Sequence, residues 1–365
     1  MSGEIAAVSA AAGAVIGVLA AAMSGALIVL LYPLLKRYAL AKPNARSSHR
    51  TPTPQGAGIA VIAATVAAIL IAAGLRLFGP GLNPPLPAIL AAAVVMAGIG
   101  AIDDIHPLPA APRLLLQAII VAGVIYTLPD QLRIVPLLPW WLERLVLVLG
   151  GLWFVNLVNF MDGLDWMTVA EVVPVTAALA MIGAFGLLPP AEMTVSLALC
   201  GAMLGFAYFN RPIARLFLGD VGSLPVGLLL GWLLVQLAGH GGLAAAILLP
   251  LYYLADATIT LTRRVINGEK VWQAHRSHFY QRATDRGFTV SQVVAHVFAV
   301  NVALAALAFV TLAAPGRLNE AAALLCGAAL VGWLLSAFAR GRGAGRRWPP
   351  HPGAEQGEEP GIHNR

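Results

Sequence analysis

The stretch 156–165 reads Asn-Leu-Val-Asn-Phe-Met-Asp-Gly-Leu-Asp and closes the apolar run 145–160. It places two amides and two carboxylates at the end of an otherwise apolar segment. Such an end is typical of a transmembrane helix that holds a polar group at the bilayer surface. A hard cation and a phosphate are the obvious candidates for that group. The stretch therefore predicts a membrane-embedded fold with a polar site at one face.

The composition of the whole chain supports this prediction. Of the 365 residues, 59% are hydrophobic and 11% are charged, whereas soluble domains carry roughly 25% charged residues. A helix needs about 17–25 apolar residues to cross a hydrocarbon core of ~30 Å. We therefore expect an all-α polytopic membrane protein with 10–11 transmembrane helices, near 10–35, 56–74, 86–102, 112–128, 142–160, 167–188, 193–209, 222–238, 243–261, 290–314 and 319–339.

The positions of Lys and Arg predict the orientation of these helices. Segments 36–55, 103–113, 210–221, 262–289 and 340–365 hold 19 of the 23 Lys and Arg residues. Cytoplasmic loops carry the excess of these residues in membrane proteins. We therefore expect a periplasmic N-terminus and a cytoplasmic C-terminus. The net charge of +6 needs no nucleic acid partner to explain it.

The apolar segments form one predicted membrane domain, residues 1–340, which is followed by residues 341–365. The latter are rich in Arg, Gly, Pro and Glu, a composition typical of a disordered tail. The first apolar segment lacks a basic leader and is too long for a signal-peptide core, so we expect an uncleaved anchor. Cys200 and Cys326 both lie in apolar segments and indicate neither a disulfide nor a zinc site.

Two adjacent acids, Asp103 and Asp104, end the third apolar segment. Neighbouring carboxylates at a membrane interface are costly unless a cation or hydrogen-bond donors compensate them. Carboxylates at a helix C-terminus also oppose the helix dipole. A solvated helix end is the alternative interpretation. A functional role is favoured, since six of the eight Asp residues fall on predicted cytoplasmic segments.

The stretch 217–223 reads Phe-Leu-Gly-Asp-Val-Gly-Ser and precedes the eighth apolar segment. The glycines around Asp220 let the backbone approach an anion, and the following helix N-terminus offers N–H groups. The alternative is a capped turn, in which Asp220 or Ser223 is the N-cap residue. The stretch taken alone leaves both interpretations open.

The longest basic loop contains His275-Arg276-Ser277-His278. Two His that flank an Arg are suited to clamping a diphosphate, whereas a loop that only sets topology would explain the charge but not the His pair. The loop between the first two apolar segments carries His49 and Arg50. Their cations are suited equally to a nucleotide phosphate and to lipid headgroups.

Asp256 is the one Asp that the sequence places inside a predicted span. Arg263 follows seven residues later, on the same face of a helix. We therefore expect a buried ion pair or a hydrogen-bonded acid with a structural role.

Taken together, these motifs resemble the polyprenyl-phosphate N-acetylhexosamine-1-phosphate transferases, glycosyltransferase family 4. The resemblance runs from about residue 42 to residue 286 in the family's order. The pair 103–104 resembles the Asp-Asp motif, followed by Arg113 to Gln117. The stretch 156–165 resembles Asn-x-x-Asn-x-x-Asp-Gly-x-Asp, and 217–223 resembles Phe-x-Gly-Asp-x-Gly-Ser. The His-rich loop of the family matches residues 275–278 in part.

The resemblance implies a set of residue roles. Asp220 and Asn159 would be ligands of Mg²⁺, for which Mn²⁺ could substitute. Asp103, Asp104, Asp220 and His278 would be catalytic. Substrate-binding residues would be Asn156, Asp162, Asp165, Phe217, His275, Arg276, His49 and Arg50, with Asp165 and Phe217 holding the uracil.

The implied reaction transfers an N-acetylhexosamine 1-phosphate from a UDP-sugar to undecaprenyl or another polyprenyl phosphate, with release of UMP. Such enzymes lie in the bacterial inner membrane with the site on the cytoplasmic face, and a homodimer is compatible with the resemblance. The sequence of residues 275–282 most resembles that of the family branch that initiates O-antigen. The peptidoglycan branch is the alternative, although Trp166-Met-Thr replaces its usual Gly-Leu-Ala. A transporter for an anionic lipid or nucleotide sugar is the alternative from another class.

Overall fold

A computed structural model describes residues 2–41, 52–77, 85–270 and 275–342 of the chain. Within these ranges the chain forms helices and one two-stranded antiparallel ribbon, in which Leu40 pairs with Pro54. The elements are α1 (Ser2–Tyr38), β1 (Leu40–Ala41), β2 (Thr53–Pro54), α2 (Gly58–Gly74), α3 (Leu86–Ile105), α4 (Ala110–Tyr126), α5 (Trp140–Met161), α6 (Met167–Ala184), α7 (Pro190–Asn210), α8 (Asp220–Gly239), α9 (Leu243–Leu248), α10 (Leu251–Ile266), α11 (Phe279–Asp285), α12 (Val290–Ala313) and α13 (Arg317–Arg340).

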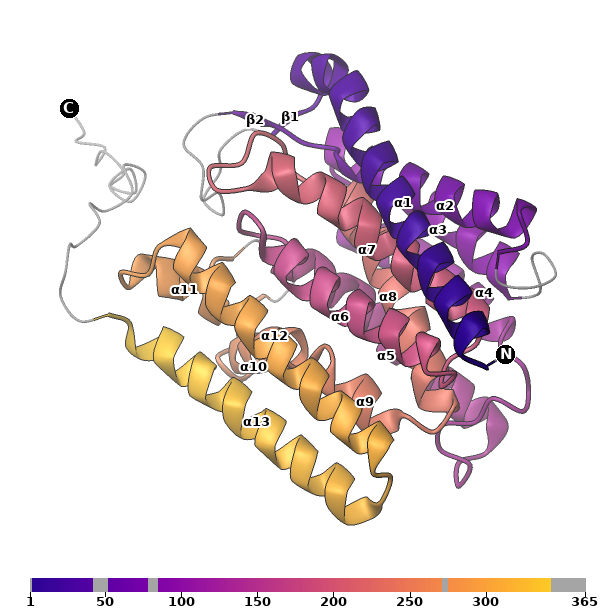
Figure 1. Ribbon diagram of the computed structural model, residues 1–365. Coiled ribbons are helices and arrows are strands. Elements are labelled where there is room, and N and C mark those ends of the chain that lie inside the picture. The colour runs from indigo at the N-terminus through magenta and orange to yellow at the C-terminus, as the bar shows by residue number, and fades with distance from the viewer. Residues whose placement is uncertain (1, 42–51, 78–84, 271–274, 343–365) are drawn as a thin grey trace, which may run out of the picture.

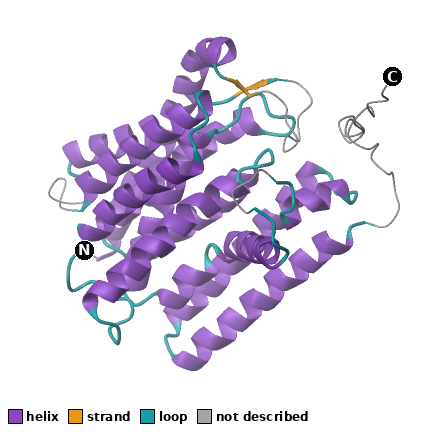
Figure 2. Ribbon diagram, turned by 180° about the vertical axis from the view of Figure 1, so that it is seen from behind, coloured by secondary structure: helices purple, strands orange, loops and turns teal. Residues whose placement is uncertain are grey.

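The helices confirm the predicted fold class, an all-α polytopic membrane protein. In the described part of the chain, eight helices are long and apolar enough to cross a membrane, and α2 and α4 are shorter apolar helices. Figure 2 shows how little strand accompanies them. The predicted tail, 341–365, lies outside the described residues apart from its first two positions.

The ninth predicted span, 243–261, is not one continuous helix. It is divided into α9 and α10 on either side of Pro250. A proline has no N–H group, and its ring collides with the carbonyl group four residues earlier, so it interrupts a helix. The apolar composition predicted the segment, but the effect of Pro250 within it was overlooked.

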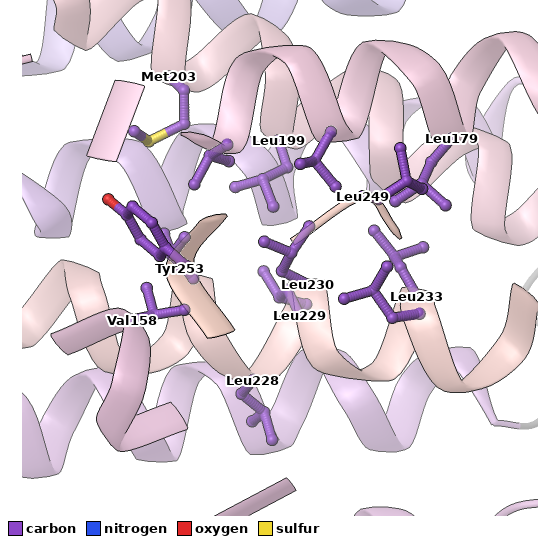
Figure 3. Packing of buried hydrophobic residues seen from close by; sticks show 14 of the residues in the cluster. Val158, Leu179, Leu199, Met203, Leu228, Leu229, Leu230, Leu233, Leu249 and Tyr253 are labelled. Atoms are coloured by element: carbon purple, nitrogen blue, oxygen red, sulfur yellow. The ribbon is translucent and has the colours of Figure 1, made fainter. Parts of the chain in front are cut away.

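Helix α8 lies at the centre of the bundle, while α1 and α13 lie on opposite flanks (Figure 1). The apolar residues of α8 occur on all sides of the helix, which is typical of a helix surrounded by protein. Figure 3 shows Leu228, Leu229, Leu230 and Leu233 of α8 packed among buried side chains of neighbouring helices. The chain segments that flank α8 are therefore fixed by dense packing.

The start of α8 lies very close to the last turns of α3. A Cβ atom added at Gly100 of α3 would lie 2.2 Å from the carbonyl oxygen of Asp220. No side chain larger than hydrogen fits such a distance, so the glycine permits the close approach of the two backbones. This approach places the acids at the end of α3 beside the acid at the start of α8.

A buried acid that the sequence interpretation overlooked joins α6 to α12. Glu171 is 0% exposed, and its Oε2 accepts a hydrogen bond of 2.7 Å from Nδ2 of Asn301. The same amide nitrogen donates to the carbonyl oxygen of Ala170 at 3.0 Å. A polar group in an apolar interior needs such a partner. The pair therefore fixes the position of α12 against α6.

Candidate functional site

The polar residues singled out by sequence gather where several helices end. The C-terminal ends of α3 and α5 meet the N-terminal end of α8, as contacts from Asp104 and Asn159 to the start of α8 demonstrate. Helix ends carry backbone groups without intrahelical partners, so this region is rich in polar atoms. Each functional side chain therefore projects from a fixed helix end or from a short loop beside it.

Asp103 is held by a backbone and a side-chain donor. It is 8% exposed, and its Oδ1 accepts a hydrogen bond from the N–H of Leu108 at 2.6 Å. Its Oδ2 lies 2.5 Å from Nη1 of Arg113, in the first turns of α4. The same Nη1 is 3.9 Å from Oδ2 of Asp220. Arg113 therefore lies between two carboxylates from different helices.

Asp104 binds the N-terminal end of α8. Its Oδ1 accepts a hydrogen bond from the N–H of Asp220, and its Oδ2 accepts one from Val221, both at 3.0 Å. A carboxylate at this position satisfies N–H groups that the helix cannot pair internally and is favoured by the helix dipole. Asp104 is thus a cap for α8 supplied by another helix.

Asp220 and Asn159 form the second half of the acidic centre. Nδ2 of Asn159 donates to Oδ1 of Asp220 at 2.8 Å and to Oγ of Ser223 at 2.9 Å. The amide and the carboxylate that sequence singled out separately are thus in direct contact. The carboxyl groups of Asp103 and Asp220 also lie close enough to interact. We call Asp103, Arg113, Asn159 and Asp220 the acidic centre.

The donor set of the acidic centre suits a magnesium ion. Within the described residues, no group of three His, Cys, Asp or Glu side chains could hold a metal, so a protein cage made of such ligands is not present there. Two carboxylates and an amide do converge. Mg²⁺ typically takes one or two protein carboxylates and completes its shell with water and substrate phosphates. The residues present therefore fit a Mg²⁺ ion that takes part of its ligands from outside the protein.

Asp162 lies in the loop after α5. It accepts a short hydrogen bond from Oγ1 of Thr168. Burial raises its pKa from the ordinary value of 3.8 to about 6, and the nearby charges of Asp104 and Asp165 act in the same direction. Both effects disfavour the charged form. The folded protein thus favours the protonated form of Asp162.

Asp165 and Trp166 join the same loop to the segment after α7. Oδ2 of Asp165 accepts a hydrogen bond of 2.9 Å from the N–H of Ala214. Trp166 has a φ of 63°, and its N–H donates to Oδ1 of Asn210 at 2.7 Å. Non-glycine residues in this left-handed region often mark functional loops. The sequence interpretation gave Trp166 no role, and its backbone conformation was not predictable from its residue type.

Asn156 faces a neighbouring helix. Its Nδ2 donates to Oε1 of Gln117 on α4 at 2.8 Å and to the carbonyl oxygen of Leu152 at 2.9 Å, and the residue is 5% exposed. The contacts link α5 to α4, the helix that carries Arg113. Asn156 thus supports the site through packing in this structure.

Phe217 lies at the entry to α8 and pairs with the segment after β2. Its N–H donates to the carbonyl oxygen of Pro54 at 2.9 Å, and its own carbonyl oxygen accepts from the N–H of Ala57 at 3.0 Å. The side chain is half-buried. These bonds bring the end of the first loop to the acidic centre. His49 and Arg50 of that loop lie outside the described residues.

The basic loop that contains the two histidines is internally bonded. Nδ1 of His275 is 2.8 Å from Oγ of Ser277, and the rings of His275 and His278 are 5.0 Å apart. Arg276 donates to Oγ1 of Thr284 at 3.0 Å and forms an ion pair of 3.2 Å with Asp285. The paired histidines predicted by sequence are therefore neighbours in space.

Tyr280 connects this loop to the stretch 156–165. Its hydroxyl group donates a hydrogen bond of 3.1 Å to the carbonyl oxygen of Phe160. A Cβ atom added at Gly163 would lie 2.2 Å from the same hydroxyl oxygen. Gly163 is thus required by close packing. Tyr280 is a residue that the sequence interpretation missed, and an isolated Tyr in a basic loop gave no signal for it.

Asp256 is buried as expected, but Arg263 is not the partner that the sequence suggested. Nδ1 of His278 lies 3.2 Å from Oδ1 of Asp256. The guanidinium of Arg263 instead lies over the ring of Phe279, 5.6 Å from its centroid, a distance typical of a cation–π contact. Helical spacing predicted that Arg263 and Asp256 share one face of a helix. The same spacing could not show that a loop distant in sequence supplies His278 as the partner of Asp256.

Comparison with known proteins places this geometry in context. Residues 86–238, which include the whole acidic centre, match the family model described as glycosyl transferase family 4. The chain is 30% identical over 296 residues to the decaprenyl-phosphate N-acetylglucosaminephosphotransferase of Mycobacterium leprae, covering 71% of this chain and 73% of the relative.

Two further relatives carry related names. The probable undecaprenyl-phosphate N-acetylglucosaminyl 1-phosphate transferase of Bacillus subtilis is 25% identical over 273 residues, covering 70% of this chain and 74% of the relative. The phospho-N-acetylmuramoyl-pentapeptide-transferase of Mycobacterium leprae is 26% identical over 219 residues, covering 48% of this chain and 61% of the relative. The similarity to the N-acetylglucosaminyl 1-phosphate transferase thus extends over more of the chain than the similarity to the pentapeptide transferase.

Replacing Gly163 by Ala should lower the apparent melting temperature, because the new methyl group collides with the Tyr280 hydroxyl. Overpacking of this kind typically costs ~1–3 kcal/mol. Adding Tyr280→Phe to the Gly163→Ala variant removes the hydroxyl oxygen and should restore part of the lost melting temperature. Thermal unfolding in detergent of the wild type, both single variants and the double variant measures the coupling. Strictly additive effects would contradict the close contact.

Replacing Asp162 by Asn should raise the apparent melting temperature of the metal-free protein near pH 7.5 and leave it almost unchanged below pH 4. The folded protein favours protonated Asp162, so its stabilising contribution is complete below pH 3.8 and is lost as the pH rises through about 6. A shift of two pKa units corresponds to about 3 kcal/mol at most. Thermal unfolding in a chelator from pH 4 to 8 tests this, and parallel pH profiles for wild type and variant would refute it.

Proposed function

Because the chain belongs to glycosyl transferase family 4, we propose that it transfers an N-acetylhexosamine 1-phosphate from a UDP-sugar to a polyprenyl phosphate and releases UMP. The observation that carries this proposal is the acidic centre, where Asp103 and Asp220 flank Arg113 at 2.5 Å and 3.9 Å. Carboxylates for a cation beside a guanidinium for a phosphate form a site for phosphoryl chemistry.

The proposed reaction depends on positioning and charge. Transfer of a phosphoryl group needs two anionic substrates to be held in line and their charges to be neutralised. The acceptor, a phosphate monoester with a second pKa of ~6, is largely dianionic at neutral pH and needs little help from a general base. Asp103 therefore contributes by orienting Arg113, which would hold a phosphate, and a cation bound beside them would supply further positive charge.

Mg²⁺ is the proposed cofactor, with Mn²⁺ as a substitute. Asp220 and Asn159 are the proposed ligands, and Asp103 is close enough to Asp220 to contribute a second carboxylate. The bound cation would neutralise charge on the diphosphate as a Lewis acid. Asp104 supports this arrangement indirectly by fixing the start of α8, which carries Asp220.

Most of the other predicted substrate-binding residues are assigned here to the two ends of a nucleotide sugar. We assign the diphosphate to His275, Arg276 and His278, together with His49 and Arg50 of the first loop. Uracil recognition is assigned to Asp165 and Phe217, as the family resemblance implies. Asp165 is 5% exposed and bonded to Ala214, so base binding would require part of the 210–216 segment to take part.

The donor sugar that we propose is N-acetylglucosamine. Two relatives of which the match covers 73% and 74% are named for N-acetylglucosamine, whereas the match to the N-acetylmuramoyl-pentapeptide enzyme spans 61% of that relative. The cytoplasmic location of the site rests on the distribution of Lys and Arg. Initiation of O-antigen or of another lipid-linked cell-envelope glycan is the proposed place of the reaction.

The purified protein should release UMP from UDP-N-acetylglucosamine in the presence of polyprenyl phosphate, and release should stop in a chelator and resume with added Mg²⁺. UDP-N-acetylgalactosamine and UDP-N-acetylmuramoyl-pentapeptide serve as competing donors. Chromatographic measurement of UMP and of the lipid product decides the result. No release from any donor would refute the reaction, and undiminished release in the chelator would refute the cation.

Replacing Asp103 by Asn should lower kcat by about 10²–10³-fold, the effect typical of losing one preorganised charged or polar contact at a reaction centre. The neutral amide cannot pair with Arg113 as a carboxylate does. Asp130→Asn is the matched control, because Asp130 is exposed in the loop after α4 and should retain full activity. A rate for Asp103→Asn within twofold of the wild type would remove Asp103 from the mechanism.

A further inference from the structure

Asp256 has no direct role in the proposed reaction, yet it is the most heavily bonded acid in the described part of the chain. Its side chain is 0% exposed. Oδ1 accepts hydrogen bonds from Oγ1 of Thr260 at 3.3 Å, from Nδ1 of His278 at 3.2 Å and from the N–H of Phe279 at 3.0 Å. Oδ2 accepts from the hydroxyl of Tyr252 and from the N–H of Tyr280, both at 3.1 Å.

The five donors come from two separate parts of the chain. Tyr252 and Thr260 lie one turn before and one turn after Asp256 on α10, whereas the other three belong to the loop that contains both histidines and to the start of α11. Two of the latter are backbone N–H groups at a helix N-terminus, which a carboxylate satisfies well. Asp256 thus attaches this loop to α10.

The bond to His278 has a chemical consequence beyond attachment. A neutral imidazole carries its proton on one ring nitrogen, and the hydrogen bond made by that nitrogen selects the tautomer. A carboxylate can only accept, so the Asp256 contact places the proton on Nδ1. In the neutral ring Nε2 then carries the lone pair, which repels a phosphate oxygen, whereas in the cation it carries a second proton and can donate a hydrogen bond to that oxygen.

We propose that Asp256 is a positioning residue that keeps a proton on Nδ1 of His278 and fixes the orientation of its ring, so that the cationic ring donates from Nε2 to the diphosphate of the donor. This proposal rests on the proposed function. The stacking of His278 on Tyr280 at 5.7 Å restrains the same ring from one face. Tyr280 is in turn bonded to Phe160, so the orientation of His278 is tied to the stretch that carries Asn159.

An amide at position 256 could not replace the carboxylate. Asn has one acceptor oxygen and one donor nitrogen, whereas three of the five groups around Asp256, namely Nδ1–H of His278 and two backbone N–H groups, only donate. In one orientation the amide nitrogen of the Asp256→Asn variant would replace Oδ1 of Asp256. This nitrogen would then face the N–H of Phe279, and it would donate to Nδ1 of His278, which would have to carry a lone pair. The ring would then be held neutral, with its proton on Nε2, and would lose the positive charge that attracts a phosphate. Asp-to-Asn replacement beside a catalytic His is known to act in this way. In the opposite orientation the amide nitrogen would face the N–H of Tyr280 instead.

The first test is a double-variant cycle with Asp256→Asn and His278→Gln. Asp256→Asn should lower kcat at least tenfold with little change in KM for the nucleotide sugar. In the His278→Gln background the same replacement should cost less than twofold, since its effect passes through His278. Thr260→Val is the control, because it removes one donor from Asp256 without touching His278, and it should keep kcat within threefold. Equal losses in both backgrounds would overturn the proposal.

The second test does not depend on turnover. Nuclear magnetic resonance of protein with ¹⁵N-labelled histidine distinguishes the two tautomers, and the His278 signals are identified by their loss in His278→Gln. Wild type and Thr260→Val should show protonated Nδ1. An Nε2–H tautomer in the wild type would overturn the proposal even if Asp256→Asn fails to fold. Failure of UMP release with the expected tautomer would instead refute the proposed function alone.

Discussion

The N-terminal N–H groups of α8 are the constraint on which the site depends. An apolar interior offers no water to satisfy them, so another part of the protein must supply an acceptor. Asp104 at the end of α3 does so with both carboxylate oxygens. Because this contact fixes the two helix ends together, Asp103 and Asp220 are adjacent. The two neighbouring acids thus have separate tasks, one in holding helices together and one in the acidic centre.

The stretch 156–165 distributes its polar groups in different directions from one helix end. Asn159 contacts Asp220, the carbonyl group of Phe160 accepts from Tyr280, and Asp165 binds the backbone at Ala214. The helix period and the loop that follows explain this divergence, since successive residues point to different sides. The stretch is therefore the part of the chain that joins the acidic centre to the loop containing the histidines.

The sequence was sufficient for the fold class, and it singled out several residues that the structure brings together. Apolar runs predicted the helices, and motifs 117 residues apart, around Asp104 and Val221, proved to be in contact. Local patterns could not predict the break at Pro250, the left-handed Trp166, or the choice of His278 over Arg263 as the partner of Asp256. Each depends on which distant group reaches a given position. Such information lies in tertiary packing, which spacing along one helix does not contain.

The central position of α8 has a consequence for the order in which the site is assembled. Its contacts with the acids of α3 and the amide of α5 involve residues that all precede position 224. Synthesis proceeds from the N-terminus, and membrane helices already made can associate while later ones are still emerging. The acidic centre can therefore be complete before α10 leaves the ribosome. The loop anchored by Asp256 is synthesised after every residue of the acidic centre.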